Sequence, residues 1–132
     1  MSKLYVVPTP IGNLGDMTNR AVETLNSCDL ILAEDTRHTQ KLLNHFNIKT
    51  KMISYHKFNE KQRSEEIIHK LLNEDINAAL VTDAGTPCIS DPGYELVREV
   101  RKKGIEVIGS TGASALTTAL SISGIETYEF AF

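Results

Sequence analysis

Apolar residues follow two alternating patterns along the chain. Five short runs are almost continuously apolar, as is typical of strands buried on both faces: residues 4–8, 29–33, 51–54, 77–82 and 105–108. Between them, apolar residues recur every three or four positions, which predicts helices. The expected helices are Met17–Asn26, Thr36–Phe46, Glu60–Asn73, a helix opened by Asp91 and stopped at Gly104, and Ser114–Ser123. This alternation predicts an α/β fold, a five-stranded parallel sheet with helices on both faces.

Local residue types refine the helix starts and the end of the chain. Thr18 suits the N-cap of the first helix. Asp91 suits an N-cap and Pro92 the first helical position, where its missing N–H costs nothing. The aromatic-rich end, Tyr128–Phe132, predicts an amphipathic strand or a connector. Because no turn signal follows it, we expect the chain to be truncated there.

The composition is that of an ordinary globular protein. The chain has 132 residues, 41% of them hydrophobic and 23% charged, which favours one domain spanning residues 1–132. No stretch approaches the roughly 18 apolar residues of a membrane span. Two cysteines, Cys28 and Cys88, indicate neither a disulfide framework nor a metal site, so we expect a metal-free cytoplasmic protein.

The net charge of −3 is unevenly distributed. Residues 37–63 contain seven Lys or Arg and one acid, so this basic segment carries +6 and the rest of the chain −9. A polyanion responds to local charge, which makes the segment a candidate RNA contact. A solvated helix face and loop would produce the same pattern.

Small residues, glycines and prolines collect where the predicted strands end. These segments are Pro8–Gly15, Glu34–Arg37, Asp83–Pro87 and Gly109–Ala115. Ligands of open parallel sheets bind at this edge. Neither G-x-G-x-x-G nor a phosphate loop is present, which disfavours a dinucleotide fold and a P-loop kinase. Pro8 and Pro10 lack backbone donors, so their loop suits a ligand held by shape and carbonyl acceptors.

The same segments carry a resemblance to a known family. Val7–Leu14, Ala33–Arg37, and Asp83–Pro87 followed by Ile89–Gly93 closely resemble signature segments of the ribosomal RNA small subunit methyltransferase I family, within the tetrapyrrole-methylase superfamily. Tyr55–Glu60 is similar to another family segment. One departure is Thr111–Ala115, where the family usually carries Pro-Gly-Pro-Ser/Cys-Ala.

The resemblance implies an S-adenosylmethionine-dependent enzyme that methylates the ribose 2′-hydroxyl of a cytidine in small-subunit ribosomal RNA. It implies a two-domain homodimer with the cofactor between domains, and strand order 3-2-4-1-5. Residues 1–132 would be the N-terminal cofactor-binding domain, with the C-terminal domain absent. We therefore expect this fragment alone to be inactive and to bind cofactor poorly.

The resemblance also suggests site residues. The expected cofactor-binding residues are Pro10, Ile11, Gly12, Asp83, Ala84, Gly85, Thr86, Pro87, Ile89, Ser90, Ser114 and Ala115. Asp35 and His56 are candidates for the base or orienting group, and Arg37 for a phosphate contact. Purely structural roles stay open: Asp83 as a turn cap, Asp35 as a helix cap, Arg37 paired with Glu34, and His56 as an exposed loop residue.

Two other functions stay open. One is a small-molecule methylase acting on a tetrapyrrole or diphthine-type precursor, although such relatives typically carry Gly-Asp-Pro where this chain has Gly85-Thr86-Pro87. The other is a non-catalytic ligand-binding or dimerisation fragment.

Overall fold

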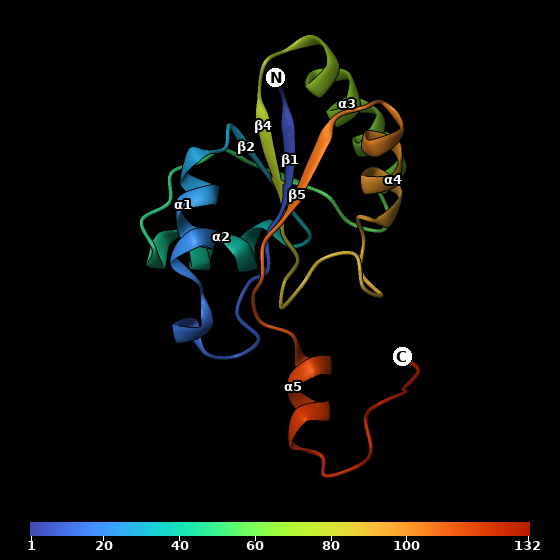
Figure 1. The fold of residues 1–132 in the computed structure, drawn as a ribbon. Coiled ribbons are helices and arrows are strands. Elements are labelled where there is room, and N and C mark those ends of the chain that lie inside the picture. The colour runs from blue at the N-terminus through green and yellow to red at the C-terminus, as the bar shows by residue number, and fades with distance from the viewer.

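Five parallel strands form the centre of the protein in the computed structural model, which describes residues 1–132. In space they run β3-β2-β4-β1-β5 (Figure 1). Their bounds are β1 Lys3–Val6, β2 Leu30–Ala33, β3 Met52–Ser54, β4 Asn77–Leu80 and β5 Glu106–Gly109. Every neighbouring pair is parallel, so the predicted sheet and strand order are confirmed.

Helices cover both faces of the sheet, which explains why the strands are apolar throughout. The helices α1 (Asn19–Ser27) and α2 (Thr36–His45) lie on one face, and α3 (Glu60–Asn73) and α4 (Tyr94–Lys102) on the other (Figure 1). Along β2, Ile31 and Ala33 pack into the core cluster on the α1–α2 face, whereas Leu30 and Leu32 pack into the cluster on the α3–α4 face. All four residues of β2 are buried.

Side-chain caps set the start of three helices. The Thr18 hydroxyl accepts a hydrogen bond from the Ala21 N–H at 3.0 Å, which confirms it as the N-cap of α1. Asp35 caps α2, and Ser114 caps α5 (Ala115–Ile122). These short oxygen side chains satisfy backbone donors that the first turn of a helix leaves free.

The predicted start of α4 is wrong. Asp91 is not the N-cap and Pro92 is not in the helix; Gly93 is the N-cap, and the helix begins at Tyr94. Gly93 has φ of 125°, a conformation that side chains rarely adopt, so the chain turns there rather than at Asp91. The far end of α4 is as predicted, with Gly104 at φ 76° after the last turn.

Helix α5 projects away from the layered sheet (Figure 1). It contains no buried residue, although its sequence ALTTALSI is largely apolar. The following segment, Tyr128–Phe132, is exposed and contains no strand. Of the two structures predicted for it, the connector is therefore confirmed and the strand is wrong.

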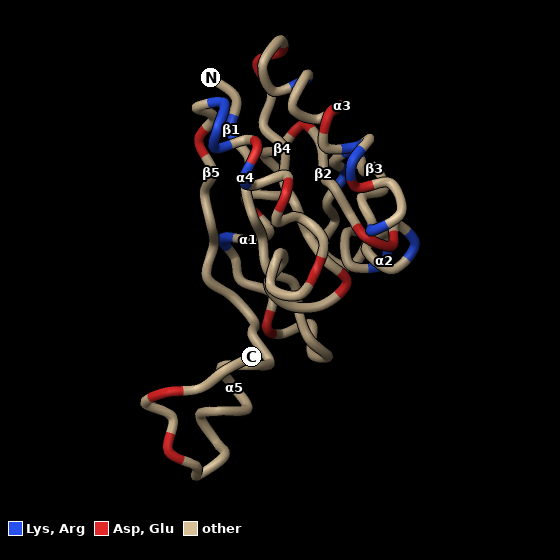
Figure 2. Tube along the Cα trace, turned by 90° about the vertical axis from the view of Figure 1, so that its right-hand side faces the viewer, with Lys and Arg blue, Asp and Glu red and all other residues tan.

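The basic segment lies at one side of the fold. Figure 2 shows its lysine and arginine residues gathered around α2 and β3, whereas acidic residues are scattered over the molecule. No helix of the chain has the length and apolar character needed to cross a membrane.

Candidate functional site

The loops that follow β1 and β4 are joined at the carboxyl edge of the sheet. The Thr9 N–H donates to the Gly85 carbonyl at 3.0 Å, and the Gly85 N–H donates to the Thr9 carbonyl at 2.9 Å. Thr9 is 2% exposed, and its hydroxyl donates to the Thr82 carbonyl at 3.1 Å. Thr9 therefore fixes the predicted cofactor segments Pro10–Gly12 and Asp83–Pro87 against one another.

The loop after β5 joins the same cluster through small residues. Gly85 has φ of 82°, and a Cβ built on it would lie 3.3 Å from Ile11 Cγ2. A Cβ on Gly112 would lie 2.6 Å from Pro8 Cβ, so no larger residue fits between these loops. The Thr86 hydroxyl donates to the Ala113 carbonyl at 3.1 Å, directly before Ser114 and Ala115.

Asp83 connects this cluster to the start of α2. Its Oδ1 accepts a hydrogen bond from the Asp35 N–H at 3.1 Å, and its carbonyl lies 3.0 Å from His38 Nε2. Its side chain therefore links two loops rather than capping its own turn. Nearby, the Thr82 hydroxyl donates to Glu34 Oε1 at 3.2 Å.

The three predicted catalytic residues occupy different settings. Asp35 Oδ1 accepts from the Arg37 N–H at 3.0 Å and the His38 N–H at 3.4 Å, which is the helix-cap role. Arg37 is exposed and forms no salt bridge with Glu34. His56 is half-buried, and its Nδ1 accepts from the Phe58 N–H at 3.2 Å. The structure thus brings Asp35 to the Asp83 loop, while His56 is held within its own loop.

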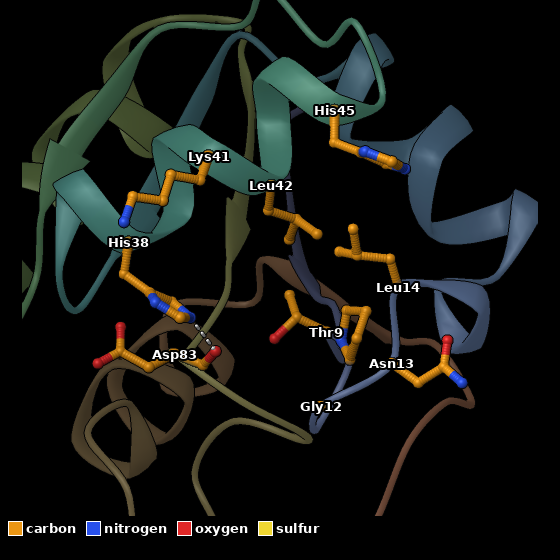
Figure 3. A pocket seen from close by; sticks show the side chains of 10 residues that line it. Thr9, Gly12, Asn13, Leu14, His38, Lys41, Leu42, His45 and Asp83 are labelled. Atoms are coloured by element: carbon orange, nitrogen blue, oxygen red, sulfur yellow. Dashed lines mark hydrogen bonds between the residues drawn. The ribbon is translucent and has the colours of Figure 1, made fainter.

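A cavity of about 310 Å³ separates the first loop from α2 (Figure 3). We call it the α2 pocket; it is lined by Thr9, Pro10, Gly12, Asn13, Leu14, His38, Lys41, Leu42, His45 and Asp83. Its volume lies at the lower end of the range for small-molecule sites. In Figure 3, His38 reaches from α2 to the Asp83 carbonyl, and His45 faces Leu14 across the pocket.

The other side of the first loop borders a second hollow. We call it the α5 hollow; it measures about 510 Å³ and is lined by Ile11, Asp16, Thr18, Gly112, Ala113, Ser114, Thr117 and Thr118. Its only charged residue is Asp16, whereas the α2 pocket contains Asp83 together with Lys41 and two histidines. The two hollows therefore differ in charge, although Pro10–Gly12 lies between them.

Sequence reasoning missed the α2 wall of the pocket. His38, Lys41 and His45 lie three and then four residues apart, the spacing that places residues on one helix face. His45 is exposed, and it also lines the pocket. The helical spacing was available in the sequence, but nothing in it indicates that this face meets the first loop.

The predicted cofactor residues Ile89 and Ser90 are less closely joined to the cluster. Both are exposed, and Ser90 has φ of 57°. Beside them, burial and then the Asp83 carboxylate raise the pKa of Asp91 above its ordinary value. Asp83 and Asp91 therefore form an acidic pair at the edge of the loop.

Both thiols are expected to be unreactive at neutral pH. Burial raises the pKa of both Cys28 and Cys88 to about 11. The nearby Asp29 carboxylate adds to this effect at Cys28, and the Asp91 carboxylate adds to it at Cys88. Since the thiolate is the nucleophile, alkylation by iodoacetamide at pH 8 should be about a hundredfold slower than in the urea-unfolded chain. The rate should rise with pH up to about 11, where the thiols ionise. Equal rates for folded and unfolded chains would contradict this.

Comparison with known proteins gives the family. The family profile for tetrapyrrole (corrin/porphyrin) methylases matches residues 3–131. A protein of Synechocystis sp. named ribosomal RNA small subunit methyltransferase I is 59% identical over 132 residues, which are 100% of this chain and 47% of that protein. A Vibrio cholerae protein of the same name is 54% identical over 98% of this chain and 44% of its own length. The chain thus spans about half the length of these relatives.

Solved structures agree on the fold. Uroporphyrin-III-C-methyltransferase from Thermus thermophilus superposes with a TM-score of 0.71 at 22% identity, over 94% of this chain and 53% of that one. A diphthine synthase superposes with a TM-score of 0.72 at 16% identity, over 99% of this chain and 52% of that one. The resemblance drawn from the motifs is confirmed, and the chain belongs to the tetrapyrrole (corrin/porphyrin) methylase family.

Proposed function

We propose that this chain is the N-terminal, cofactor-binding part of an enzyme that methylates a cytidine in small-subunit ribosomal RNA at the ribose 2′-hydroxyl. The observation that supports this proposal is a sequence identity of 50–59% to relatives named ribosomal RNA small subunit methyltransferase I, over nearly the whole chain. Because the chain spans about half of those relatives, the proposal concerns the complete enzyme, acting as a cytoplasmic homodimer.

The proposed cofactor is S-adenosylmethionine, and the loop cluster fits it. Bound there, the cofactor supplies a methyl group on a positively charged sulfur. Gly12 leaves open space where a Cβ would stand, so a ligand can approach the backbone closely. The acidic pair Asp83 and Asp91 would complement the positive charges of the cofactor, and Pro10–Gly12 and Thr86 would supply carbonyl and hydroxyl contacts.

We propose that the α2 pocket binds the part of the RNA that accepts the methyl group. Lys41, His38 and His45 give its helix wall a positive or ionisable character, and the basic segment continues around α2 and β3 (Figure 2). The α5 hollow lacks any cation, so it suits a cationic cofactor better than a phosphate chain. Asp83, assigned above to the cofactor, also lines the α2 pocket, so donor and acceptor would meet beside this residue.

The test uses a chimera in which residues 1–132 replace the matching residues of the Synechocystis relative. We expect the chimera to transfer tritium from labelled S-adenosylmethionine to small subunits that lack the modification. The 132-residue chain alone should show no turnover and weak cofactor binding, because it would contact only part of the ligand. Transfer to a tetrapyrrole or diphthine-type precursor, but not to RNA, would overturn the proposal.

The basic segment supplies a further expectation for RNA binding. Arg37→Ala together with Lys57→Ala in the chimera should weaken binding to small subunits and lower the salt slope by about one unit per lost phosphate contact. Cofactor affinity should stay within about twofold. Arg101→Ala with Lys103→Ala removes the same charge at the opposite edge of the sheet and serves as the control. If both double variants bind alike, the basic segment is only a solvated face.

A further inference from the structure

His38 has the hydrogen-bonding arrangement of an oriented base. Its Nε2 lies 3.0 Å from the Asp83 carbonyl oxygen. A carbonyl can only accept a hydrogen bond, so Nε2 must carry the hydrogen. In the neutral imidazole, Nδ1 then has a lone pair, and no other group in the structure is bonded to this ring. The Asp83 loop therefore selects the ring form that can take up a proton at Nδ1.

Of the two bases suggested from the sequence, His56 has no free lone pair on its neutral ring, and Asp35, whose Oδ2 accepts no hydrogen bond, lies outside the α2 pocket. His56 Nδ1 already accepts a hydrogen bond from the Phe58 N–H, so in the neutral ring the hydrogen is on Nε2 and the lone pair is engaged. Asp35 Oδ1 accepts two backbone hydrogens as the cap of α2. Neither residue lines the α2 pocket, whereas His38 does.

The position of His38 also matches what an acceptor hydroxyl requires. The ring stands between Lys41 on its own helix and the Asp83 loop, on the charged side of the first loop (Figure 3). The second histidine of the pocket, His45, contacts the Phe46 ring edge-on at a centroid distance of 4.8 Å, and no carbonyl fixes its ring form. His38 is thus the oriented histidine of the pocket.

We propose that Nδ1 of His38 accepts the proton of the substrate hydroxyl during methyl transfer, an inference that rests on the proposed function. The hydroxyl oxygen forms its new bond to the methyl carbon as the carbon–sulfur bond breaks, and that bond pair stays on sulfur. The hydroxyl proton moves to Nδ1, which gives an imidazolium, a methyl ether and a neutral thioether. The imidazolium later releases its proton to water. The Asp83 carbonyl stabilises the imidazolium through the Nε2–H that it already accepts.

The first test needs only the 132-residue chain. Nitrogen-15 NMR of labelled histidines, assigned with His38→Gln, His45→Gln and His56→Gln, reports which ring nitrogen carries the hydrogen. We expect neutral His38 to be protonated at Nε2 alone. A cytidine hexaribonucleotide should shift the His38 Nδ1 signal more than the matching deoxyribonucleotide, since only the former offers a 2′-hydroxyl. A ring protonated at Nδ1, or equal shifts from the two oligonucleotides, would overturn the proposal.

The second test separates this proposal from the proposed function. Glutamine at position 38 keeps an N–H donor for the Asp83 carbonyl but has no nitrogen that can accept a proton. In the chimera, His38→Gln should lower kcat about a hundredfold and change KM for small subunits less than threefold. The control is His69→Gln, which changes an exposed histidine of α3 on the other face of the sheet and should retain the parent kcat. An active parent with an equally active His38→Gln variant defeats the His38 role alone. If the chimera without any substitution is inactive, the proposed function is defeated. The NMR result then decides whether His38 can accept a proton at Nδ1.

Discussion

Gly93→Ala should destabilise the chain by about 3 kcal/mol. Two costs add at this position. Its φ of 125° strains any side chain, and an added Cβ would lie 2.5 Å from Leu80 Cδ2 and 2.9 Å from Cys88 Sγ. Leu80 is 1% exposed at the end of β4, so it cannot move aside without disturbing the sheet.

A second glycine separates these two costs. Gly104 also has a positive φ, 76°, but a Cβ there would have nothing within 4 Å. Gly104→Ala should therefore lose only the conformational part, about 1 kcal/mol. Urea unfolding followed by circular dichroism gives the free energy of unfolding of both variants. Equal slopes of that free energy against urea concentration would show that the substitutions change stability and not the surface exposed on unfolding. Equal losses for the two variants would mean that the contacts with Leu80 and Cys88 are unimportant.

The sheet could be predicted because its signals are local and repeated. Each strand is an apolar run, and residues such as Ile67 and Leu71 recur at the helical period, so every strand and α-helix was predicted, whereas the short 3-10 helix Leu14–Asp16 was not. The start of α4 could not be located in the same way. Asp91-Pro92 is a good helix-start signal, but the turn is set by Gly93 packing on Leu80, a contact between residues thirteen positions apart. Tertiary packing overrides local preference there.

The site was only partly accessible to sequence reasoning. The strand-end rule located the loops that meet through Thr9 and Gly85. The rule could not show that Asp35 caps α2 or that the Asp83 carbonyl holds the His38 ring. These hydrogen bonds depend on the exact positions of side chains and backbone, which the strand-end rule does not give. Resemblance identified the motif that contains these residues, but the division of roles among them follows from the three-dimensional arrangement.

Asp83→Asn in the chimera is expected to weaken S-adenosylmethionine binding ten- to a hundredfold. The substitution leaves the loop in place, because an amide oxygen can still accept from the Asp35 N–H and the backbone carbonyl still accepts from His38. What is lost is the negative charge of the acidic pair with Asp91. A hydrogen bond to a charged group contributes about 1.5–3 kcal/mol, which corresponds to that range of affinity.

Asp29 offers a matched control at the opposite edge of the sheet. Its Oδ2 accepts from the Asn77 N–H at 2.9 Å, so it forms the same kind of cross-loop bond away from the site. Asp29→Asn should leave cofactor affinity unchanged in calorimetry. Asp83→Ala should lose the charge and also the bond to Asp35, lowering the free energy of unfolding by about 1 kcal/mol beyond the asparagine variant. If Asp83→Asn binds cofactor as tightly as the parent, Asp83 serves only to hold the loops, and the positive charges of the cofactor are met elsewhere.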